Sequence, residues 1–397
     1  MNSDFLIAGS GIIGLTVAWT LANKYPEAKI TILEKEPGVG YHSSGKNSGV
    51  LHSGIYYPPG TYKAEFTKKG RLALTEFCLD HDVPFRKIGK IIIPTDPYQK
   101  DQLDLLYQRG LQNGVNVTRL NKDELYLREP LIKSATDTGL FIEDTSIANP
   151  KILLKKLAED LSNKGVEVLF GQKIIKADLK TNLIKTEKSE FSFGHFINCA
   201  GLYADKIAHM FDMGKDYTIL PFKGIYWKLK PGSDIKFNHL VYPVPDLRVP
   251  FLGVHTMINT EDEIYFGPTA VPAFSRENYS GLRGLNLPDM TKISALLCIQ
   301  YLANRDGFRR LAWQEGRRYF KYWFTQAVRA IVPSLEPQNL IPSDKIGIRA
   351  QMYQYSTKKL VDDFVIEKGE NSTHILNSIS PAWTCSFPVA EMIIKDL

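Results

Sequence analysis

The chain has 397 residues, of which 44% are apolar and 23% charged, and its formal net charge is +6. This length favours about two or three domains. The mild charge argues against a nucleic-acid binder, although it leaves room for attraction to acidic small molecules or to an anionic membrane surface. The four dispersed cysteines fit a reducing cytosol and predict no metal site. Without a signal peptide or a spanning segment, we expect a cytoplasmic protein, soluble or peripheral on the inner face of a membrane.

The first segment has the pattern of a dinucleotide-binding unit. An apolar strand at 5–8 leads into a glycine-rich turn at 9–14, a helical pattern, and a second strand that ends on Glu34. The glycines allow the tight turn, the approach of the backbone to a pyrophosphate, and close helix–strand packing, while the helix start supports the pyrophosphate. Glu34 is placed to accept hydrogen bonds from ribose hydroxyls. The predicted cofactor contacts here are Gly9, Gly11, Ile12, Ile13, Gly14, Glu34 and Lys35.

The loop at 40–60 distinguishes between possible dinucleotides. An NAD domain continues promptly into its next βα unit, whereas here a long polar loop rich in glycine and serine intervenes. Small residues clear space for a flat ring, and hydroxyl and amide groups can donate to phosphate and ring oxygens. These features indicate FAD. The predicted contacts are Ser43, Ser44, Asn47, Ser48 and Gly49.

Three later segments complete the predicted FAD site. A strand that ends at Cys199 leads into two small residues, Ala200 and Gly201, and then a helix. The backbone of Ile174 can bond an adenine edge. The turn before the last helix, with Pro381, Ala382 and Thr384, aims that helix start at the flavin, where its dipole would stabilise the negative charge of reduced flavin. No cysteine falls in the 40–60 loop, so we expect the FAD to be bound non-covalently.

Taken together, these segments resemble the L-2-hydroxyglutarate dehydrogenase/oxidase family, within the D-amino-acid-oxidase-like flavoproteins. The resemblance covers nearly the whole chain and is carried by "NSGVLHSGIYY" (47–57), "LREP" (127–130), "CAGLYAD" (199–205), "PFKGIYWKL" (221–229), "NHLVYPVPDLRVPFLGVH" (238–255), "GPTAVPAFSRENY" (267–279) and "GIRAQMYQYSTKKLVDDFVI" (347–366). It implies oxidation of L-2-hydroxyglutarate to 2-oxoglutarate with FAD. It also implies a quinone, or alternatively oxygen, as the electron acceptor.

The chain departs from the family pattern where the substrate should lie. The differing positions are Lys46, Asn149, Pro150, Thr269, Ile379 and Trp383. Trp383 adds a bulky indole next to the expected flavin, where the family keeps a small residue. We therefore expect either a smaller substrate or a cavity widened at Asn149 and Pro150.

The chemistry of a 2-hydroxy acid suggests roles for several residues. A base takes the hydroxyl proton while the C2 hydrogen leaves as hydride to flavin N5, and cations hold the carboxylates. His52 is the first choice for the base and His255 the second. Arg349 can clamp a carboxylate with two hydrogen bonds, and Gln351 is expected on the same face. Tyr242 and Trp383 are expected to line the substrate cavity, and Lys223 is a weaker candidate.

The predicted fold is α/β, with a discontinuous Rossmann-like FAD domain formed by residues 1–85, 145–215 and 345–397. Residues 86–144 and 216–344 should form the substrate domain, an antiparallel sheet with helices, because the chain at 216–274 alternates apolar and polar residues. The architecture is D-amino-acid-oxidase-like.

The stretch 308–332 is helical in pattern and rich in basic and aromatic residues, which suits a membrane interface. We favour the alternative that its aromatics pack on the sheet. They are Trp313, Tyr319, Phe320, Tyr322, Trp323 and Phe324, between Arg309, Arg310, Arg317, Arg318 and Lys321.

Two other functions are compatible with these residues. An amine or amino-acid oxidase of the same superfamily would act on a different small carboxylate. A flavoprotein retained for binding would show little turnover.

Overall fold

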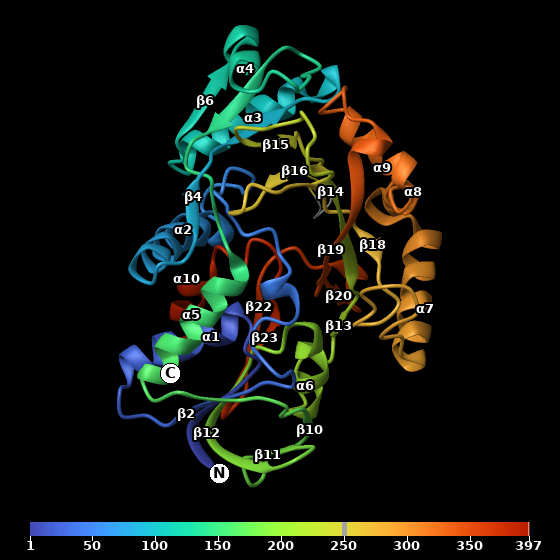
Figure 1. Cartoon of the computed structure of the whole chain (residues 1–397). Helices are drawn as coiled ribbons and strands as arrows, with labels where there is room; N and C mark the ends of the chain where they lie inside the picture. Colours follow the sequence, from blue (N-terminus) through green and yellow to red (C-terminus); the bar gives the residue numbers. More distant parts are fainter. Residues whose placement is uncertain (248–251, 396) are drawn as a thin grey trace.

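The computed structural model describes residues 1–247, 252–395 and 397. Residues 248–251, which lie within the 238–255 motif, are outside the described residues. Figure 1 shows an elongated molecule whose lower half holds both chain termini and whose upper half is formed by the middle of the chain. Within the described chain, no helix is both long and apolar enough to cross a membrane.

The lower half is built on one eight-stranded sheet. Its path runs β10-β11-β12-β1-β2-β9, and β23 joins β12 and carries β22. The strands β1, β2, β9, β12 and β23 pair in parallel. The bounds are β1 (Asn2–Ala8), β2 (Ile30–Leu33), β9 (Glu167–Leu169), β10 (Ile174–Asp178), β11 (Leu183–Thr186), β12 (Glu190–Asn198), β22 (Val365–Lys368) and β23 (Ser372–Asn377).

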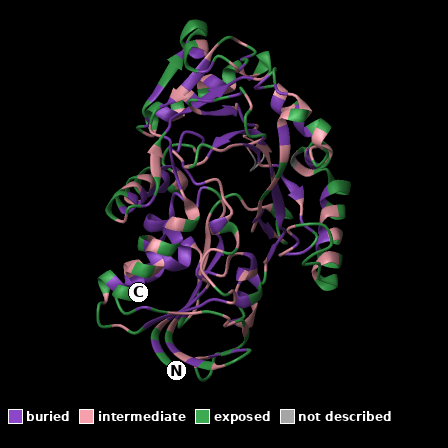
Figure 2. Cartoon of the chain, viewed as in Figure 1, coloured by how far each residue is buried: buried purple, intermediate pink, exposed green. Residues whose placement is uncertain are grey.

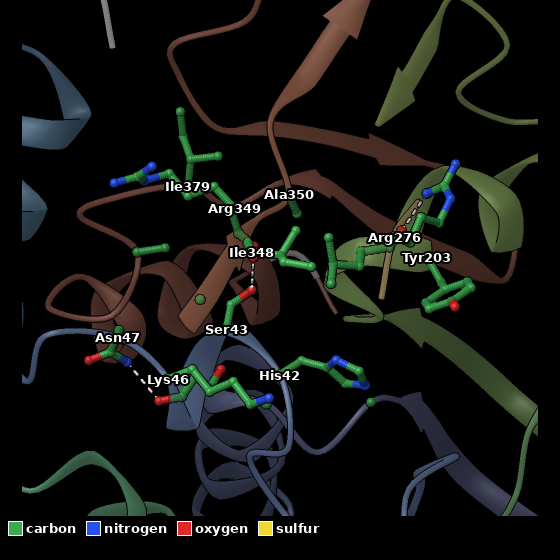
Figure 3. Close-up of a pocket in the computed structure, with 18 of the residues that line it drawn as sticks. His42, Ser43, Lys46, Asn47, Tyr203, Arg276, Ile348, Arg349, Ala350 and Ile379 are labelled. Atoms are coloured by element: carbon green, nitrogen blue, oxygen red, sulfur yellow. Dashed lines mark hydrogen bonds between the residues drawn. The ribbon is translucent and has the colours of Figure 1, made fainter. Parts of the chain in front are cut away.

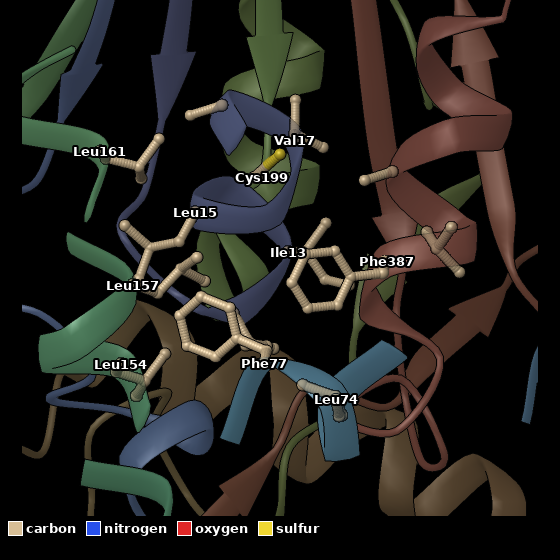
Figure 4. Close-up of a cluster of buried hydrophobic side chains, with 14 of the residues drawn as sticks. Ile13, Leu15, Val17, Leu74, Phe77, Leu154, Leu157, Leu161, Cys199 and Phe387 are labelled. Carbon is tan, nitrogen blue, oxygen red and sulfur yellow. The ribbon is translucent and has the colours of Figure 1, made fainter. Parts of the chain in front are cut away.

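Both faces of this sheet are covered, because alternate side chains of a strand point to opposite faces. In β1, Ile7 belongs to the core formed with α1 (Ile12–Lys24), α2 (Tyr62–Asp80), α5 (Pro150–Asn163) and α10 (Ser386–Ile394), whereas Leu6 and Ala8 pack with α6 (Ala204–Met210). Figure 4 shows the first of these cores, where Leu15, Phe77, Leu157 and Phe387 converge from the four helices. Each such side chain contributes roughly 1.5–3 kcal/mol on burial, so this core fixes the helix that follows the glycine turn.

The upper half contains two larger sheets. A four-stranded sheet has the order β15-β5-β7-β6, and a five-stranded sheet has β16-β17-β14-β18 with β19 paired to β14. All of these pairs are antiparallel except β15 with β5. The bounds are β5 (Lys90–Ile93), β6 (Val117–Leu120), β7 (Gly139–Ile142), β14 (Phe222–Leu229), β15 (Leu240–Pro243), β16 (His255–Ile258), β17 (Ile264–Gly267), β18 (Val271–Pro272) and β19 (Leu340–Arg349), with helices α3 (Lys100–Gln112), α4 (Lys122–Arg128), α7 (Leu287–Ala303), α8 (Phe308–Arg317) and α9 (Lys321–Arg329).

Two three-stranded sheets complete the fold. One has the order β3-β8-β4 and the other β13-β20-β21. Their bounds are β3 (Val50–Leu51), β4 (Phe85–Lys87), β8 (Ser146–Ala148), β13 (Tyr217–Ile219), β20 (Met352–Gln354) and β21 (Lys359–Leu360).

The domain boundary expected at residue 345 falls inside a strand. The pairing of β19 with β14 continues without a break to Arg349, opposite Phe222, so residues 345–349 belong to the upper sheet. The chain rejoins the eight-stranded sheet only at β22. This boundary depends on the pairing of β19 with the distant strand β14, which composition does not indicate.

The packing expected for the six aromatics named above is wrong for five of them. Phe324 is fully buried beside Trp227, as expected. Trp313 and Phe320 are 65% and 63% exposed, and Tyr319, Tyr322 and Trp323 are also exposed. These helices lie on the right-hand edge of the molecule, where Figure 2 shows exposed residues in green beside intermediate and buried ones.

Candidate active site

A cavity of about 850 Å³ lies between the two halves of the fold. Its walls come from segments far apart in the sequence, including the glycine turn after β1, the loop around residues 40–52, the end of β12, the end of β19, and the turn before α10. Figure 3 shows the part of the cavity where Ser43 and Lys46 of the loop face Ile348 and Arg349 of β19. This volume is within the range of cofactor and substrate pockets.

The glycine turn forms one end of the cavity and has no room for side chains. Gly9 has φ +98°, and a Cβ there would lie 2.7 Å from the Cys199 carbonyl oxygen. A Cβ on Gly14 would lie 2.0 Å from the Gly9 carbonyl oxygen, so only glycine lets α1 approach the turn. Gly11 begins α1 with no side-chain cap and no acidic residue in the first turn. The positive end of the helix dipole is therefore available for an anionic group in the cavity.

The predicted nucleotide contacts lie around this turn. Gly9, Gly11, Ile12, Ile13, Glu34, Lys35, Ile174, Ala200 and Gly201 all line the cavity. The Glu34 carboxylate accepts hydrogen bonds from the Ser10 amide and hydroxyl, both at 2.8 Å, and from the Glu36 amide at 2.9 Å. Glu34 thus holds the turn against the end of β2. In such domains, the acidic residue that accepts hydrogen bonds from the ribose hydroxyls lies at this position. Gly14 lies behind the lining and acts through packing.

The polar loop side chains shape the loop as well as the cavity. Ser44 Oγ accepts a hydrogen bond from the Ile12 amide at 3.0 Å, and Ser43 Oγ donates to the Ile348 carbonyl at 2.7 Å (Figure 3). Asn47 donates to the Ser44 carbonyl and accepts from the Gly49 amide. These bonds tie the loop to both α1 and β19. Ser43, Ser44, Asn47 and Ser48 line the cavity, whereas Gly49 lies outside the lining.

The opposite end of the cavity is formed by residues that we call the histidine face: His52, Tyr226, Tyr242, His255 and Arg349. His52 follows β3, and its amide donates to Thr384 Oγ1 at 3.1 Å. His255 opens β16, is 5% exposed, and stacks on the Tyr242 ring with centroids 3.8 Å apart. Its Nδ1 lies 2.8 Å from the Gly253 carbonyl. In the neutral ring this contact assigns the proton to Nδ1 and leaves Nε2 as an acceptor.

Both histidines of this face are held in the neutral form. Burial lowers the pKa of His52 to about 3, and the charges of Lys90 and His255 act in the same direction. Burial likewise lowers the pKa of His255 to about 3, against the hydrogen bond to Gly253 and with help from Arg349 and Lys90. His52 Nδ1 is buried and has no hydrogen-bond partner among the described residues. The face therefore offers two unprotonated imidazoles near neutral pH.

Arg349 brings a guanidinium to the same face from the last residue of β19. Its Nη1 donates to the Thr269 carbonyl at 3.0 Å. Burial lowers the pKa of Arg349, while Tyr226 and Glu315 favour the charged form. A guanidinium nevertheless remains protonated in proteins. The cavity thus places a permanent cation within reach of the two neutral bases.

The turn before α10 closes the cavity beside this face. Pro381, Ala382 and Trp383 line it. Trp383 is 9% exposed, and its Nε1–H is buried without a partner in the described part of the chain. Thr384 is fully buried outside the lining, where it accepts the His52 amide and donates to the Val50 carbonyl. Thr384 therefore supports His52 and is not part of the cavity surface.

Several predicted side chains lie elsewhere. The Gln351 amide donates to the Val361 carbonyl at 2.6 Å and is not in the lining, because β19 ends at Arg349 and the strand alternation does not continue. Lys223 Nζ bonds Asn278, also outside the lining. The widening expected at Asn149 and Pro150 is wrong, since Asn149 caps α5 and neither residue lines the cavity.

Sequence reasoning missed other lining residues. Tyr226 lies within the motif at 221–229, and Glu315 lies within the basic and aromatic stretch at 308–332, but neither was expected in the cavity. Glu315 is 4% exposed and accepts the Ala270 amide at 2.6 Å. In the sequence, each is a tyrosine or a carboxylate among apolar residues. Composition does not distinguish such a residue from one in the hydrophobic core.

A cluster of Glu36, His42 and Glu277 lies at the nucleotide end, with one ligand-type atom from each within 4.8 Å of the others. Lys35 Nζ makes ion pairs with both carboxylates, at 2.7 Å from Glu277. His42 Nε2 lies 2.9 Å from Glu36, and its Nδ1 lies 2.7 Å from the Tyr279 hydroxyl. The ammonium supplies the positive charge between these carboxylates, so the cluster is an ion-pair network that joins the two halves.

Comparison with known proteins gives this arrangement a family. Residues 4–395 match the model of the family described as FAD dependent oxidoreductase. The fold resembles an L-alpha-glycerophosphate oxidase from Mycoplasma pneumoniae, solved with FAD bound, with a TM-score of 0.79, 22% identity, and coverage of 100% of this chain and 94% of that one. A glycine oxidase from Geobacillus kaustophilus gives a TM-score of 0.72 at 14% identity, with the same coverage of both chains.

The chain therefore belongs to the FAD-dependent oxidoreductases. FAD is its cofactor, and the close-packed glycines of the turn, the helix start that lines the cavity, and the cavity itself fit that group.

Within these oxidoreductases the chain belongs to the L-2-hydroxyglutarate dehydrogenase family. A protein of that name from Indibacter alkaliphilus is 36% identical and covers 100% of this chain and 98% of its own length. Those from Escherichia coli K12 and from mouse mitochondria are 32% and 33% identical, covering 99% and 98% of this chain and 93% and 87% of their own.

Proposed function

We propose that this protein oxidises L-2-hydroxyglutarate to 2-oxoglutarate. The observation that carries the proposal is the histidine face, where two neutral imidazoles and one guanidinium meet in the cavity that fits FAD. A 2-hydroxy acid requires a base for its hydroxyl and a cation for its carboxylate. The names of the relatives, at 31–36% identity over nearly the full chain, support this substrate.

In this proposal His52 accepts the hydroxyl proton and His255 shares the proton work or orients the carboxylate. His52 is first because its unpartnered Nδ1 and its Thr384-held backbone leave the ring free to face a ligand. The Nε2 of His255 is the acceptor that remains once Nδ1 is bonded to Gly253. FAD, when bound, takes up the C2 hydrogen as hydride with both electrons of the broken C–H bond.

Arg349 holds the substrate carboxylate in this proposal, with Tyr242 and Trp383 bounding the substrate. The buried, unpartnered indole N–H of Trp383 can donate to a second carboxylate of a dicarboxylate. In this proposal the Trp383 side chain donates a hydrogen bond to the substrate and also limits the length of the substrate. The FAD is bound non-covalently, since both ring nitrogens of His42 are already bonded and His52 is assigned to proton transfer.

Anaerobic reduction of the holoenzyme tests this function. L-2-hydroxyglutarate should bleach the flavin absorbance, and the D isomer should do so far more slowly. Shorter L-2-hydroxy acids and D- or L-amino acids complete the panel. Faster bleaching by an amino acid would assign the protein to the amino-acid oxidases instead, and failure of every compound would leave a flavoprotein without this turnover.

We also propose that the protein works in the cytosol and contacts the inner face of a membrane, where it passes electrons to a quinone. The docking surface is the exposed aromatic and basic group on α8, α9 and the turn between them. Arg317 lies over the rings of Trp313 and Trp323, at 5.4 and 4.9 Å from their centroids. Exposed indoles with flanking arginines suit the headgroup region of anionic lipid.

Sedimentation with vesicles of phosphatidylglycerol and phosphatidylcholine tests the docking surface. The wild-type protein should co-sediment, and the Trp313→Ser, Trp323→Ser double variant should remain in solution. Tyr98→Ser is the matched control, because Tyr98 is 94% exposed and directly precedes α3, outside the proposed docking surface. Equal binding by the double variant would refute this surface, and quinone reduction in vesicles would then have to be explained without it.

A further inference from the structure

Lys90 is a completely buried lysine behind the histidine face. It opens β5, an interior strand, and pairs with Leu240 of β15 on one side and Ile142 of β7 on the other. Its side chain has no exposed area, and its Nζ has no hydrogen-bond partner among residues 1–247, 252–395 and 397. Burying an ammonium without a carboxylate costs free energy. A lysine at this position therefore points to a role other than stability.

Aromatic rings connect this ammonium to both histidines. Lys90 Nζ lies 4.5 Å from the Tyr56 ring centroid and 5.2 Å from that of Tyr242, and Tyr242 stacks on His255. The Tyr56 hydroxyl and His52 Nδ1 are likewise buried without partners in the described chain. Among the described residues, the groups that face Lys90 are thus two tyrosines and two histidines, and no described carboxylate contributes to its pKa.

The charge of Lys90 adds to the effect of burial on the two bases. Burial lowers the pKa of Lys90 to about 7, so the ammonium is charged below neutrality. Its charge lowers the pKa of His52 and of His255, in addition to the larger effect of burial. An anionic ligand in the cavity would bring an opposing charge, and its carboxylate would make proton uptake by the histidines easier.

We propose that Lys90 is a positioning residue for the oxidation, whose buried ammonium opposes proton uptake by His52 and His255 until a carboxylate substrate balances its charge. Lys90 is not part of the cavity lining and acts through the histidines. The inference rests on the proposed function for the identity of the substrate. It goes beyond that function by assigning the electrostatic control of the bases to a residue outside the cavity.

The first test is the pH dependence of anaerobic flavin reduction in the Lys90→Met holoenzyme. Without the ammonium, the pKa of each histidine rises, so the acidic limb of the profile moves to higher pH. Since the histidine pKa values are about 3, a rise of one pKa unit should lower the reduction rate at about pH 4, relative to that at about pH 7, by about twofold. A purely structural role would lower the rate at every pH and leave the limb in place.

Lys345→Met is the matched control. Burial lowers the pKa of Lys345 to about 8, and its Nζ lies over the rings of Tyr226 and Tyr265. It does not contribute to the pKa of either His52 or His255. The acidic limb of this variant should therefore coincide with that of the wild type, and an equal shift in both variants would overturn the proposal.

The second test needs no substrate and so separates this inference from the proposed function. In holoenzyme with ¹⁵N-labelled histidine, the ring resonances of His52 and His255, assigned with His52→Gln and His255→Gln, report protonation directly. Both rings should titrate at higher pH in Lys90→Met than in the wild type. Unchanged titration would refute the role of Lys90, whereas a wild-type enzyme that L-2-hydroxyglutarate fails to reduce would refute only the substrate.

Folding of the variant is also informative. Methionine keeps the unbranched side chain and removes the desolvation cost, so Lys90→Met should be at least as stable as the wild type. Lys90→Leu provides a second neutral variant. If both variants fail to fold with FAD, the ammonium is required for the structure itself, and the positioning role is overturned.

Discussion

The buried ion pair between Arg276 and Asp205 makes the sharpest stability prediction. Asp205 lies in α6 of the lower half, and Arg276 lies in the loop after β18 of the upper half, so the pair joins the two halves beside the cavity (Figure 3 shows Arg276). The side chains are 4% and 1% exposed, and the two hydrogen bonds between them measure 2.6 and 2.8 Å. The guanidinium also donates to the Leu202 carbonyl.

Arg276→Met removes the guanidinium and leaves the carboxylate buried. Asp205 keeps hydrogen bonds from Thr218 Oγ1 at 3.1 Å and from the Ile219 amide at 3.0 Å, but it loses its counter-charge. Removing one partner of a buried pair typically costs about 3–5 kcal/mol. This is a large share of the roughly 5–15 kcal/mol that stabilises a typical domain. We therefore expect the free energy of unfolding to fall by about 3–5 kcal/mol.

The pH dependence of the free energy of unfolding provides a second, independent test of this prediction. Burial would raise the pKa of the Asp205 carboxyl, but the hydrogen bonds and charge of Arg276 outweigh burial and hold the pKa below its usual value. In the wild type the pair stabilises the fold above the ordinary carboxyl pKa, and this contribution is lost as pH falls through the depressed pKa. In Arg276→Met burial acts without Arg276 and raises the pKa, so the stability deficit should shrink as the pH is lowered.

Urea unfolding of the holoenzyme, followed by tryptophan fluorescence at several pH values, measures both effects. Arg119→Met is the control, because its pair with Asp104 is exposed and should contribute no more than about 1 kcal/mol. The reasoning is refuted if Arg276→Met costs less than this control, or if its deficit is independent of pH. Adding Asp205→Leu to Arg276→Met should recover most of the loss, since an apolar pair can replace a buried ion pair.

Three further predictions concern the cavity. His52→Gln should fold and keep its FAD but lose flavin reduction by about 10²- to 10⁴-fold in stopped-flow measurements, and a wild-type rate would transfer the base to His255. Arg349→Lys should weaken apparent substrate affinity more than FAD affinity, because an ammonium cannot form the two-pronged bond; equal affinity for every dicarboxylate would contradict this. Gly14→Ala should yield colourless protein, since its Cβ would lie 2.0 Å from the Gly9 carbonyl, and a normal flavin spectrum would falsify the packing argument.

The sequence predicts the nucleotide end of the cavity well because its determinants are local. The turn from Gly9 to Gly14, with Glu34 at the end of the next strand, is one continuous βαβ unit whose geometry follows from residue type. The loop serines and Asn47 were also expected at the cavity, where the structure places them. Their hydrogen bonds to the Ile12 amide and the Ile348 carbonyl could not be predicted, because they depend on chain segments 32 and 305 residues away.

Predictions that relied on continuing a local pattern were the ones that failed. Gln351 was expected beside Arg349 from strand alternation, but β19 ends at Arg349 and β20 begins at Met352. Asn149 was read from a motif difference as a pocket residue, although an asparagine before a proline is also a helix cap, which is its role in α5. For α8 and α9 the sequence showed a high content of basic and aromatic residues. Composition does not, however, determine which side of a helix contacts the sheet.

Buried charge is the property of this site that is hardest to predict from the amino-acid sequence. Lys90 precedes three isoleucines, which is the pattern of a polar residue at the solvent-exposed start of a strand. Its burial follows from tertiary packing, since β5 lies inside the sheet between β15 and β7 and the rings of Tyr56 and Tyr242 lie beside the ammonium. Lys90 affects the protonation of His52 and His255 without reaching the cavity. The lining residues alone thus identify the bases but not the charge of Lys90 that acts on them, and the effect of Lys90→Met on the acidic limb distinguishes these two accounts of the site.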